Sequence, residues 1–388
     1  TFEDVLARYV AANERAAEDE AFAQAGYDLL AKMEAGDPHT AQQFRAVVDL
    51  CLEGQLGVLA RIGASYECFD RESDYVRDAR LEKVLAALRE KDAVFTDEDE
   101  RLVVDLQKLG REYEEGRYFV LMRANGSSMY GYRDLAYNLD KNGAGADCNL
   151  VVMGEDHKLY QQQIALILAV GGHAAPEPIY YAYIVLKDGK MSTRQGKVVL
   201  LAEFLDRASA LARERVAEQC ATLPADQQQA IADMVAVAAI RFTVLRVSPN
   251  KNVTFDMAAS LSFTGDTGPY VQYSCARISS ILRKYDTPLP DAPGPDCPLT
   301  SDAEWALLMK LAQFPEVCAA ALAQRSVSGI AQYALETARL FTTFYHDCPV
   351  LTAETPALVS ARAQLCAATR QTLVNALGLL GIEAPERM

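Results

Sequence analysis

The chain has 388 residues, half of them hydrophobic and 23% charged, which is typical of a soluble globular protein with two or three domains. Its formal net charge of −15 argues against broad, non-specific binding to nucleic acid. The longest apolar runs, such as residues 164–170 and 234–240, are far shorter than the roughly 20 residues of a membrane-spanning helix. We therefore expect no membrane association.

The nine cysteines indicate a reducing compartment. They are scattered singly, and even the nearest two, Cys51 and Cys68, do not form a Cys-x-x-Cys pair. The four histidines are isolated as well, which disfavours a zinc site. We expect reduced thiols, a cytoplasmic location and, in the simplest case, a monomer.

The first part of the sequence has helical patterning. Residues 1–62 are rich in Ala and charged residues, with apolar side chains at helical spacing. The clearest apolar positions are Phe44, Val47, Val48 and Cys51. Alternating Tyr66, Cys68 and Phe69 predict a short strand within residues 62–73.

An amphipathic helix and two strands are expected next. Residues 80–91 place four apolar side chains on one helical face, namely Leu81, Val84, Leu85 and Leu88. Residues 102–104 and 118–121 are short runs of the apolar type that forms strands.

Residues 149–186 have the order strand, helix, strand. An apolar run at 149–153 ends at Gly154, a helix is expected from about residue 159 to 170, and residues 179–186 form a second run rich in aromatic and β-branched residues. This order predicts a right-handed βαβ unit with a parallel sheet. Because ligands bind beyond the carboxyl ends of such strands, the loops at 154–158 and 187–196 should carry the chemistry.

The remainder is helical almost to its end, apart from a Pro- and Asp-rich stretch at residues 286–298. The fold class is therefore α/β plus all-α, with a helical bundle last. Residues 241–284 contain six basic residues against Asp256 and Asp266. This cluster is open to two interpretations, a local basic face for a selective polyanion partner or an ordinary solvated surface.

The loop between glycines 189 and 196 has the composition of a phosphate site. It offers two cations, two hydroxyl groups and free backbone N–H groups, in the run Lys190, Met191, Ser192, Thr193 and Arg194. Such groups could surround a triphosphate and stabilise the charge on a leaving pyrophosphate. The alternative is a plain polar turn between two elements.

Four ordered motifs resemble one known family. The loop resembles the K-M-S-K-S signature of class I aminoacyl-tRNA synthetases, in the M-S-T-R form of arginyl-tRNA synthetases. The segments "GSSMYGYRDLA" at 126–136, "GDTGPYVQYSCARISSILRK" at 265–284 and "NALGLLGIEAPERM" at 375–388 resemble further segments of the same family. The resemblance runs over essentially the whole chain.

The resemblance implies a fold and a domain order. It implies a Rossmann-like parallel-sheet catalytic portion with a helical insertion, followed by an α-helical bundle that binds the anticodon. We place the insertion at residues 1–62, the second half of the catalytic domain at 63–202 and the bundle at 203–388.

The resemblance also assigns arginine and ATP to residues of the α/β part. Tyr130 and Asp134 would bind the guanidinium of arginine, because Asp can pair with its planar fork and Tyr can stack beside it. The alternative is a helix-surface Asp with a half-buried Tyr. His157 would line the amino-acid pocket or have an architectural role, while Gly154, Asp156 and Met191 would contact ATP.

The signature loop and the bundle receive the remaining roles. Lys190, Ser192, Thr193 and Arg194 would be the catalytic residues that act on the triphosphate, with Mg²⁺ accompanying ATP. Four residues would contact tRNA(Arg), namely Tyr270, Ser274, Arg277 and Met388. Base stacking on an aromatic ring is the physical reason for Tyr270, and its alternative is a core tyrosine at a helix junction.

One family signature is missing from the sequence. No histidine lies in an H-x-G-H motif, and the chain begins with Thr, so we interpret it as the C-terminal two-thirds of such an enzyme, without the N-terminal domain and the first half of the Rossmann fold. The main prediction is an arginine–tRNA ligase. The alternative is a truncated paralogue that binds tRNA or arginine without aminoacylation. We expect the 388 residues alone to catalyse no arginine-dependent pyrophosphate exchange and to bind tRNA weakly.

Overall fold

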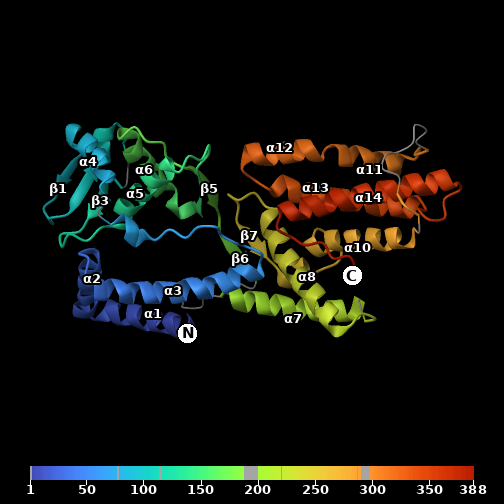
Figure 1. Ribbon diagram of the computed structural model, residues 1–388, viewed down its shortest axis with the longest axis horizontal. Coiled ribbons are helices and arrows are strands. Elements are labelled where there is room, and N and C mark those ends of the chain that lie inside the picture. The colour runs from blue at the N-terminus through green and yellow to red at the C-terminus, as the bar shows by residue number, and fades with distance from the viewer. Residues whose placement is uncertain are drawn as a thin grey trace. The chain divides into compact units, whose positions relative to one another are not determined.

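The computed structural model describes residues 2–76, 78–112, 116–187, 200–219, 221–285, 287–289 and 298–388. The chain forms two compact units (Figure 1). Unit 1 comprises Thr1–Ala60 and Ser65–Tyr180, and unit 2 comprises Arg61–Ala64 and Tyr181–Met388.

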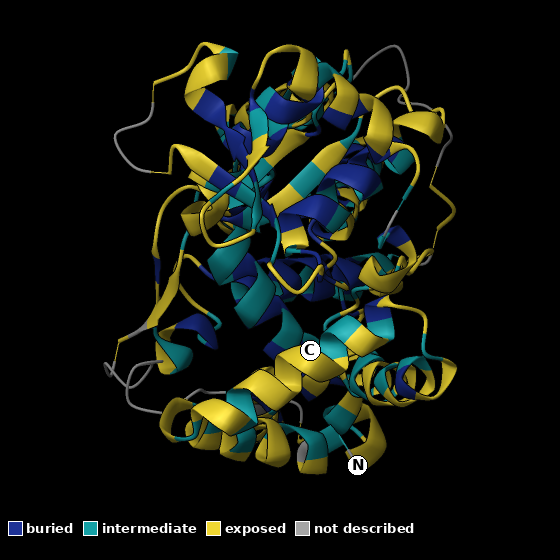
Figure 2. Ribbon diagram, turned by 90° about the vertical axis from the view of Figure 1, so that its left-hand side faces the viewer, coloured by how far each residue is buried: buried dark blue, intermediate teal, exposed yellow. Residues whose placement is uncertain are grey.

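Three helices open the chain, as the composition of residues 1–62 predicts: α1 (Phe2–Glu18), α2 (Glu20–Glu34) and α3 (Pro38–Arg61). Asp19 separates the first two, because its carboxylate caps α2 by accepting a hydrogen bond from the backbone N–H of Phe22. The expected apolar stripe of α3 is not buried in a core, since Val47 and Val48 are about half exposed. Figure 2 shows that the helices next to the N-terminus are largely exposed.

Unit 1 contains a three-stranded sheet. Its strands are β1 (Val94–Thr96), β2 (Leu102–Asp105) and β3 (Tyr118–Met122), and both pairings are antiparallel. The two strands expected at 102–104 and 118–121 are therefore confirmed, in a sheet whose antiparallel arrangement the sequence patterns did not reveal. Helix α4 (Leu81–Glu90) packs its four predicted apolar residues into the core of this unit.

The predicted strand–helix–strand order is present downstream. Strand β4 (Leu150–Gly154) leads through a 3₁₀ turn (Glu155–His157) into α6 (Lys158–Val170), and β5 (Glu177–Tyr181) pairs with β4. The expected single strand at 179–186 is wrong, because it divides into β5 and β6 (Ile184–Leu186). Between them, the backbone N–H groups of Ala182 and Tyr183 donate to Pro249 and Asn252, so these residues leave the first pairing.

Strand β6 pairs in parallel with β7 (Val253–Phe255), which lies almost 70 residues later in the chain. The strand expected within residues 62–73 is also wrong. No strand forms there among the described residues, and Tyr66 and Phe69 are exposed and contact each other through their rings. The two aromatic side chains that suggested a strand therefore form a pair on the surface.

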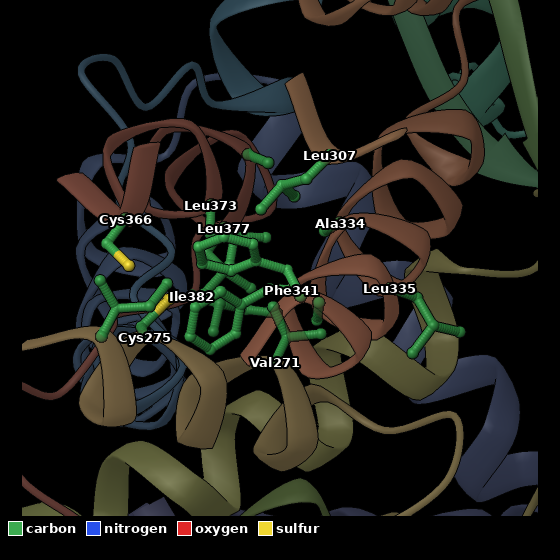
Figure 3. Packing of buried hydrophobic residues seen from close by; sticks show 14 of the residues in the cluster. Val271, Cys275, Leu307, Ala334, Leu335, Phe341, Cys366, Leu373, Leu377 and Ile382 are labelled. Carbon is green, nitrogen blue, oxygen red and sulfur yellow. The ribbon is translucent and has the colours of Figure 1, made fainter. Parts of the chain in front are cut away.

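The other elements described in unit 2 are helices. They are α7 (Leu201–Gln219), α8 (Ala225–Leu245), α9 (Met257–Ser260), α10 (Gly268–Lys284), α11 (Asp302–Ala312), α12 (Phe314–Gln324), α13 (Ser328–Asp347) and α14 (Pro356–Leu379). The last five share a core in which Phe341 lies among Val271, Leu377 and their neighbours (Figure 3). The predicted helical bundle is thus confirmed.

Among the residues that the structure describes, two helical stretches have the length and apolar composition of a membrane span. One is α8, whose apolar residues pack in the core of unit 2. The other covers Asp302–Gln324, but the helix is broken at Gln313 into two helices of 11 residues each. Each is shorter than the roughly 20 residues that a span requires.

Candidate functional site

The first residues of α5 (Tyr130–Gly143) are held against β3. The N–H of Met129, the residue before the helix, donates to Leu121 of β3. Gly131 must lack a side chain, because a Cβ at this position would collide with the ring of Phe119. Tyr130 and Asp134 are one helical turn apart, so this close packing fixes the direction of both side chains.

Asp134 is a half-buried carboxylate that is hydrogen-bonded to neutral side chains. Its Oδ2 accepts a hydrogen bond of 2.9 Å from the Tyr160 hydroxyl, and its Oδ1 accepts one of 3.2 Å from the Asn138 amide. In the described part of the chain no Lys or Arg forms an ion pair with it. Desolvation raises the pKa of Asp134, an effect that the Tyr160 hydrogen bond and the charge of Lys141 only partly oppose.

Aromatic rings flank this carboxylate. The ring centroids of Tyr130 and Tyr160 are 4.7 Å apart, and Tyr160 stacks on Phe119 at 5.8 Å. Burial, together with the neighbouring Asp134, raises the pKa of Tyr160, so its hydroxyl remains a hydrogen-bond donor at neutral pH. Tyr130 is 48% exposed, which leaves part of its ring accessible. A negative carboxylate beside accessible aromatic faces suits a flat organic cation.

His157 lies at the edge of this cluster. Its ring makes an edge contact with Tyr160 at 6.3 Å, and its Nε2 is 3.9 Å from the carboxylate of Asp156, with both side chains exposed. Gly154 is buried, and a Cβ there would collide with Asp156. The turn after β4 therefore brings His157 to the edge of the aromatic cluster, with Asp156 beside it.

The Tyr160 hydroxyl gives a first prediction. Tyr160→Phe keeps the ring and removes one hydrogen bond to Asp134, which should raise the pKa of Asp134 further and weaken binding of an organic cation by about 1 kcal/mol. Calorimetric titration of the variant measures this. An unchanged affinity would mean that the hydroxyl does not tune the carboxylate.

Tyr270 and Ser274 lie on α10 and face its own bundle. The Tyr270 hydroxyl is 2.9 Å from Thr342 Oγ1, and its ring packs against the bundle core. Ser274 is buried and donates to the carbonyl of Tyr270. The structure therefore gives both residues contacts within the bundle.

Arg277 and Met388 do come together, in an open pocket of about 420 Å³. The pocket is lined by three arginines, Arg277, Arg283 and Arg387, together with Tyr273, Met388 and small residues of α10. The guanidinium of Arg277 lies 4.8 Å from the Tyr273 ring centroid and 5.1 Å from that of Tyr345. Cations interleaved with aromatic rings are typical of sites for unpaired nucleotides.

The structure does not describe the predicted residues of the signature loop. Lys190, Met191, Ser192, Thr193 and Arg194 lie outside the described residues. Lys187, the last residue described before this segment, forms a 2.7 Å ion pair with Asp256. The pair lies at the carboxyl ends of the parallel strands β6 and β7.

The basic cluster at 241–284 is not one continuous cationic face. Arg241 is partly buried and donates to the carbonyl oxygens of Ile62 and Leu380. Arg246 and Arg339 both approach Asp266. Arg283 faces the pocket described above, so the cationic character concentrates there.

Several residues of these sites were not singled out from the sequence. Tyr160 stands in the segment "GEDHKLYQQQ" at 154–163, four residues after Asp156, where helical spacing could have drawn attention to it. Arg283, at the end of α10, was counted only as one of the six basic residues of the cluster at 241–284, and Arg387, beside the C-terminal Met388, carries no local pattern. Only the folding of the C-terminal segment onto α10 brings them together.

Comparisons with known families cover both units. The family "tRNA synthetases class I (R), catalytic domain" matches residues 1–257, and the family "DALR anticodon binding domain" matches residues 271–388.

Individual relatives of the chain are named arginine–tRNA ligase or arginyl-tRNA synthetase. The chain is 38% identical to the arginine–tRNA ligase of Methanocella arvoryzae, across 99% of this chain and 67% of that protein. It is 35% identical to the arginine–tRNA ligase of Methanospirillum hungatei, across 98% of this chain and 66% of that protein. The structure of Thermus thermophilus arginyl-tRNA synthetase matches with a TM-score of 0.77 and 29% identity, covering 95% of this chain and 70% of that one. The chain thus spans about two thirds of the length of these relatives.

Proposed function

We infer the function of this chain from its family, because it belongs to the class I arginyl-tRNA synthetases. The function is that of an arginine–tRNA ligase, and the names of the relatives favour it over the alternative of a paralogue without aminoacylation activity. In the first step the carboxylate of arginine attacks the α-phosphate of ATP, and pyrophosphate leaves. In the second, a hydroxyl of the terminal tRNA ribose attacks the arginyl carbonyl carbon, and AMP leaves.

The observation that carries the arginine assignment is the half-buried carboxylate of Asp134, with which no Lys or Arg among the described residues forms an ion pair. A half-buried carboxylate is costly unless a positive charge joins it. The guanidinium of arginine supplies that charge in a planar fork that fits two carboxylate oxygens. The rings of Tyr130 and Tyr160 would flank the guanidinium, while His157 would line the pocket further out.

The same arrangement would separate arginine from other amino acids. Citrulline has nearly the shape of arginine but no charge, so its binding would leave the carboxylate uncompensated. Lysine has the charge but presents a single ammonium group, which cannot bridge both oxygens. Discrimination would therefore come from the pairing geometry at Asp134.

We propose that ATP binds where the resemblance assigns it. Lys190, Ser192, Thr193 and Arg194 would hold the triphosphate and stabilise the leaving pyrophosphate, and Gly154, Asp156 and Met191 would contact the nucleotide. The described residues contain no cluster of three or more acidic, His or Cys side chains that could hold a metal. Mg²⁺ would accordingly arrive bound to the phosphates of ATP.

The signature loop gives a second prediction. In the protein as its gene encodes it, replacing Lys190 and Arg194 with Ala should lower kcat of pyrophosphate exchange by about tenfold or more, because both cations would act on charge that develops in the transition state. The arginine dissociation constant should change little. Exchange at the unaltered rate would identify this segment as a polar turn.

We propose the arginine-lined pocket as part of the tRNA interface. Its cations and aromatic rings favour an unstacked nucleotide of the anticodon loop, and Arg277 and Met388 keep the roles that the resemblance gives them. Tyr270 and Ser274 would support α10 from the bundle side. As partners we propose tRNA(Arg), arginine and ATP, for a cytoplasmic monomer without membrane contact.

The raised pKa of Asp134 gives a third prediction. Only the ionised carboxylate pairs with guanidinium, so arginine affinity should fall with decreasing pH at a higher pH than an ordinary Asp would produce. Binding should lower this pKa again, so that arginine releases a proton within the window between the two values. Calorimetry in buffers of different ionisation enthalpy measures that proton. No proton release across the acidic range would contradict the assignment.

The experiment that tests the proposed function is tRNA charging with a panel of amino acids, by the protein as its gene encodes it. Arginine alone should be attached. Charging by lysine or citrulline at a comparable rate would refute the role of Asp134, and arginine binding without any charging would revive the non-catalytic alternative.

A further inference from the structure

The backbone N–H and the backbone carbonyl oxygen of Ser128, two residues before α5, are both hydrogen-bonded to charged side chains. Its N–H donates to Glu34 of α2 at 2.7 Å, and its hydroxyl donates to the same carboxylate at 3.0 Å. Its carbonyl oxygen accepts hydrogen bonds of 3.1 Å from Arg123 and 3.0 Å from Arg133. Ser128 is 2% exposed, so water replaces none of these contacts.

Two charged side chains of this group, those of Glu34 and Arg133, are largely buried as well. The side chain of Glu34 is 3% exposed and lies 3.4 Å from the guanidinium of Arg133, whose own side chain is 14% exposed. A second carboxylate, that of Glu72, accepts from the same guanidinium at 2.9 Å. Arg123 lies over the ring of Tyr27, which like Glu34 belongs to α2. Helix α2 therefore reaches the start of α5 through two separate contacts.

The location of this network links it to substrate binding. Arg133 precedes Asp134 directly, and Ser128 is followed after one residue by Tyr130. A helix moves as a rigid rod over one turn, so a shift at Ser128 displaces both side chains that flank the guanidinium. Bidentate pairing tolerates little displacement, and an error of about 1 Å can cost up to about a hundredfold in a positioned reaction.

We propose that Glu34 and Arg133 are positioning residues for the arginine site, through which α2 fixes the start of α5; the inference rests on the function proposed above. Their pairing orients Asp134 without contacting the substrate. Nothing in the amino-acid composition of residues 1–62 would otherwise connect the N-terminal helices with arginine recognition.

The test is Glu34→Gln in the protein as its gene encodes it, because Gln keeps the shape and removes the charge that Arg133 requires. We expect the KM for arginine in tRNA charging to rise on the order of tenfold. The KM for ATP and the kcat at saturating arginine should stay within about twofold, since the remaining reacting groups are not attached to this network.

A matched control separates positioning from general stability. Asp105, which is 3% exposed in the same unit, pairs with Arg117 through two hydrogen bonds of 2.9 and 2.6 Å and also accepts from a backbone N–H. Asp105→Asn removes an equivalent buried charge, whose hydrogen bonds go to Arg117 and Gln107 and not to α5. It should lower the melting temperature without changing the KM for arginine.

The outcomes are distinct. Equal changes in arginine KM for Glu34→Gln and Asp105→Asn, or no change for Glu34→Gln, would overturn the proposal. If Glu34→Gln does not fold, Ser128→Ala removes both hydrogen bonds of the hydroxyl group, the one donated to Glu34 and the one accepted from Arg133, and should raise the arginine KM about threefold; an unchanged KM would again overturn it. Failure of the proposed function looks different, because the unaltered protein would then not charge tRNA with arginine.

Discussion

Replacing Asp134 with Asn should weaken arginine binding by about 2–5 kcal/mol, because the variant loses the negative charge that pairs with the guanidinium. The Asn side chain has nearly the same shape and can keep hydrogen bonds to Tyr160 and Asn138, so the surrounding packing is preserved. ATP affinity should hardly change. Isothermal titration with each ligand separately measures both effects.

The same variant should not unfold more easily. The raised pKa of Asp134 means that the folded protein binds the proton more tightly than the unfolded chain does. The stability that this gives is present below the ordinary pKa of an aspartate and is lost as the pH rises through the raised value. At neutral pH the ionised carboxylate is therefore a cost to folding, and Asn removes it.

An unchanged or higher melting temperature with lost arginine affinity is the signature of a residue kept for binding. Equal losses of arginine and ATP affinity, or a marked fall in melting temperature, would mean that Asp134 supports the fold. Asn138→Ala serves as the control, since Asn138 contacts Asp134 from the same helix but is buried in the core. It should lower stability more than it lowers affinity for arginine.

Replacing Arg277 with Ala should weaken tRNA binding by about 1–3 kcal/mol, the range expected for a base stacked or contacted in an aromatic pocket. Arg277 lies over two rings, those of Tyr273 and Tyr345, so its planar guanidinium is already oriented for stacking. The logarithm of the affinity should also depend less steeply on salt, by about one phosphate contact. Filter binding of the 388-residue chain over a range of salt concentrations measures both quantities.

The control for this variant is Arg89→Ala, which removes an exposed arginine of α4 and changes the net charge equally. If the two variants lose equal affinity, the effect is one of overall charge and the pocket is not the site. Preference for transcripts with an arginine anticodon should disappear in Arg277→Ala and persist in Arg89→Ala.

The sequence predicted those parts of the fold that depend on local periodicity. Leu81, Val84, Leu85 and Leu88 have helical spacing, and all four are buried in α4. Alternation of apolar residues predicted strands less well, because a strand also needs a partner strand with which to pair. Tyr66 and Phe69 lie on an exposed stretch without a partner strand among the described residues. The run at 179–186 has two different pairing partners and so divides into two strands.

The candidate sites likewise combine residues that a local sequence pattern predicts with residues that only the tertiary fold brings together. Tyr130 and Asp134 lie one turn apart on a single helix, and their motif was enough to place them side by side. Arg387 reaches the pocket only because the C-terminal segment folds back along α10, where Arg283 donates to the carbonyl of Glu386. Such contacts join residues about a hundred positions apart, and no local pattern encodes them.

The most direct test of the central claim is the comparison of arginine with citrulline as ligands of the protein as its gene encodes it, with and without Asp134→Asn. The two molecules differ in charge at the end of the side chain and little in shape. The unaltered protein should bind arginine and reject citrulline by more than about a hundredfold, and Asp134→Asn should remove most of that preference. Equal binding of both ligands by the unaltered protein, or an undiminished preference in the variant, would contradict the assignment of Asp134 as the group that recognises arginine.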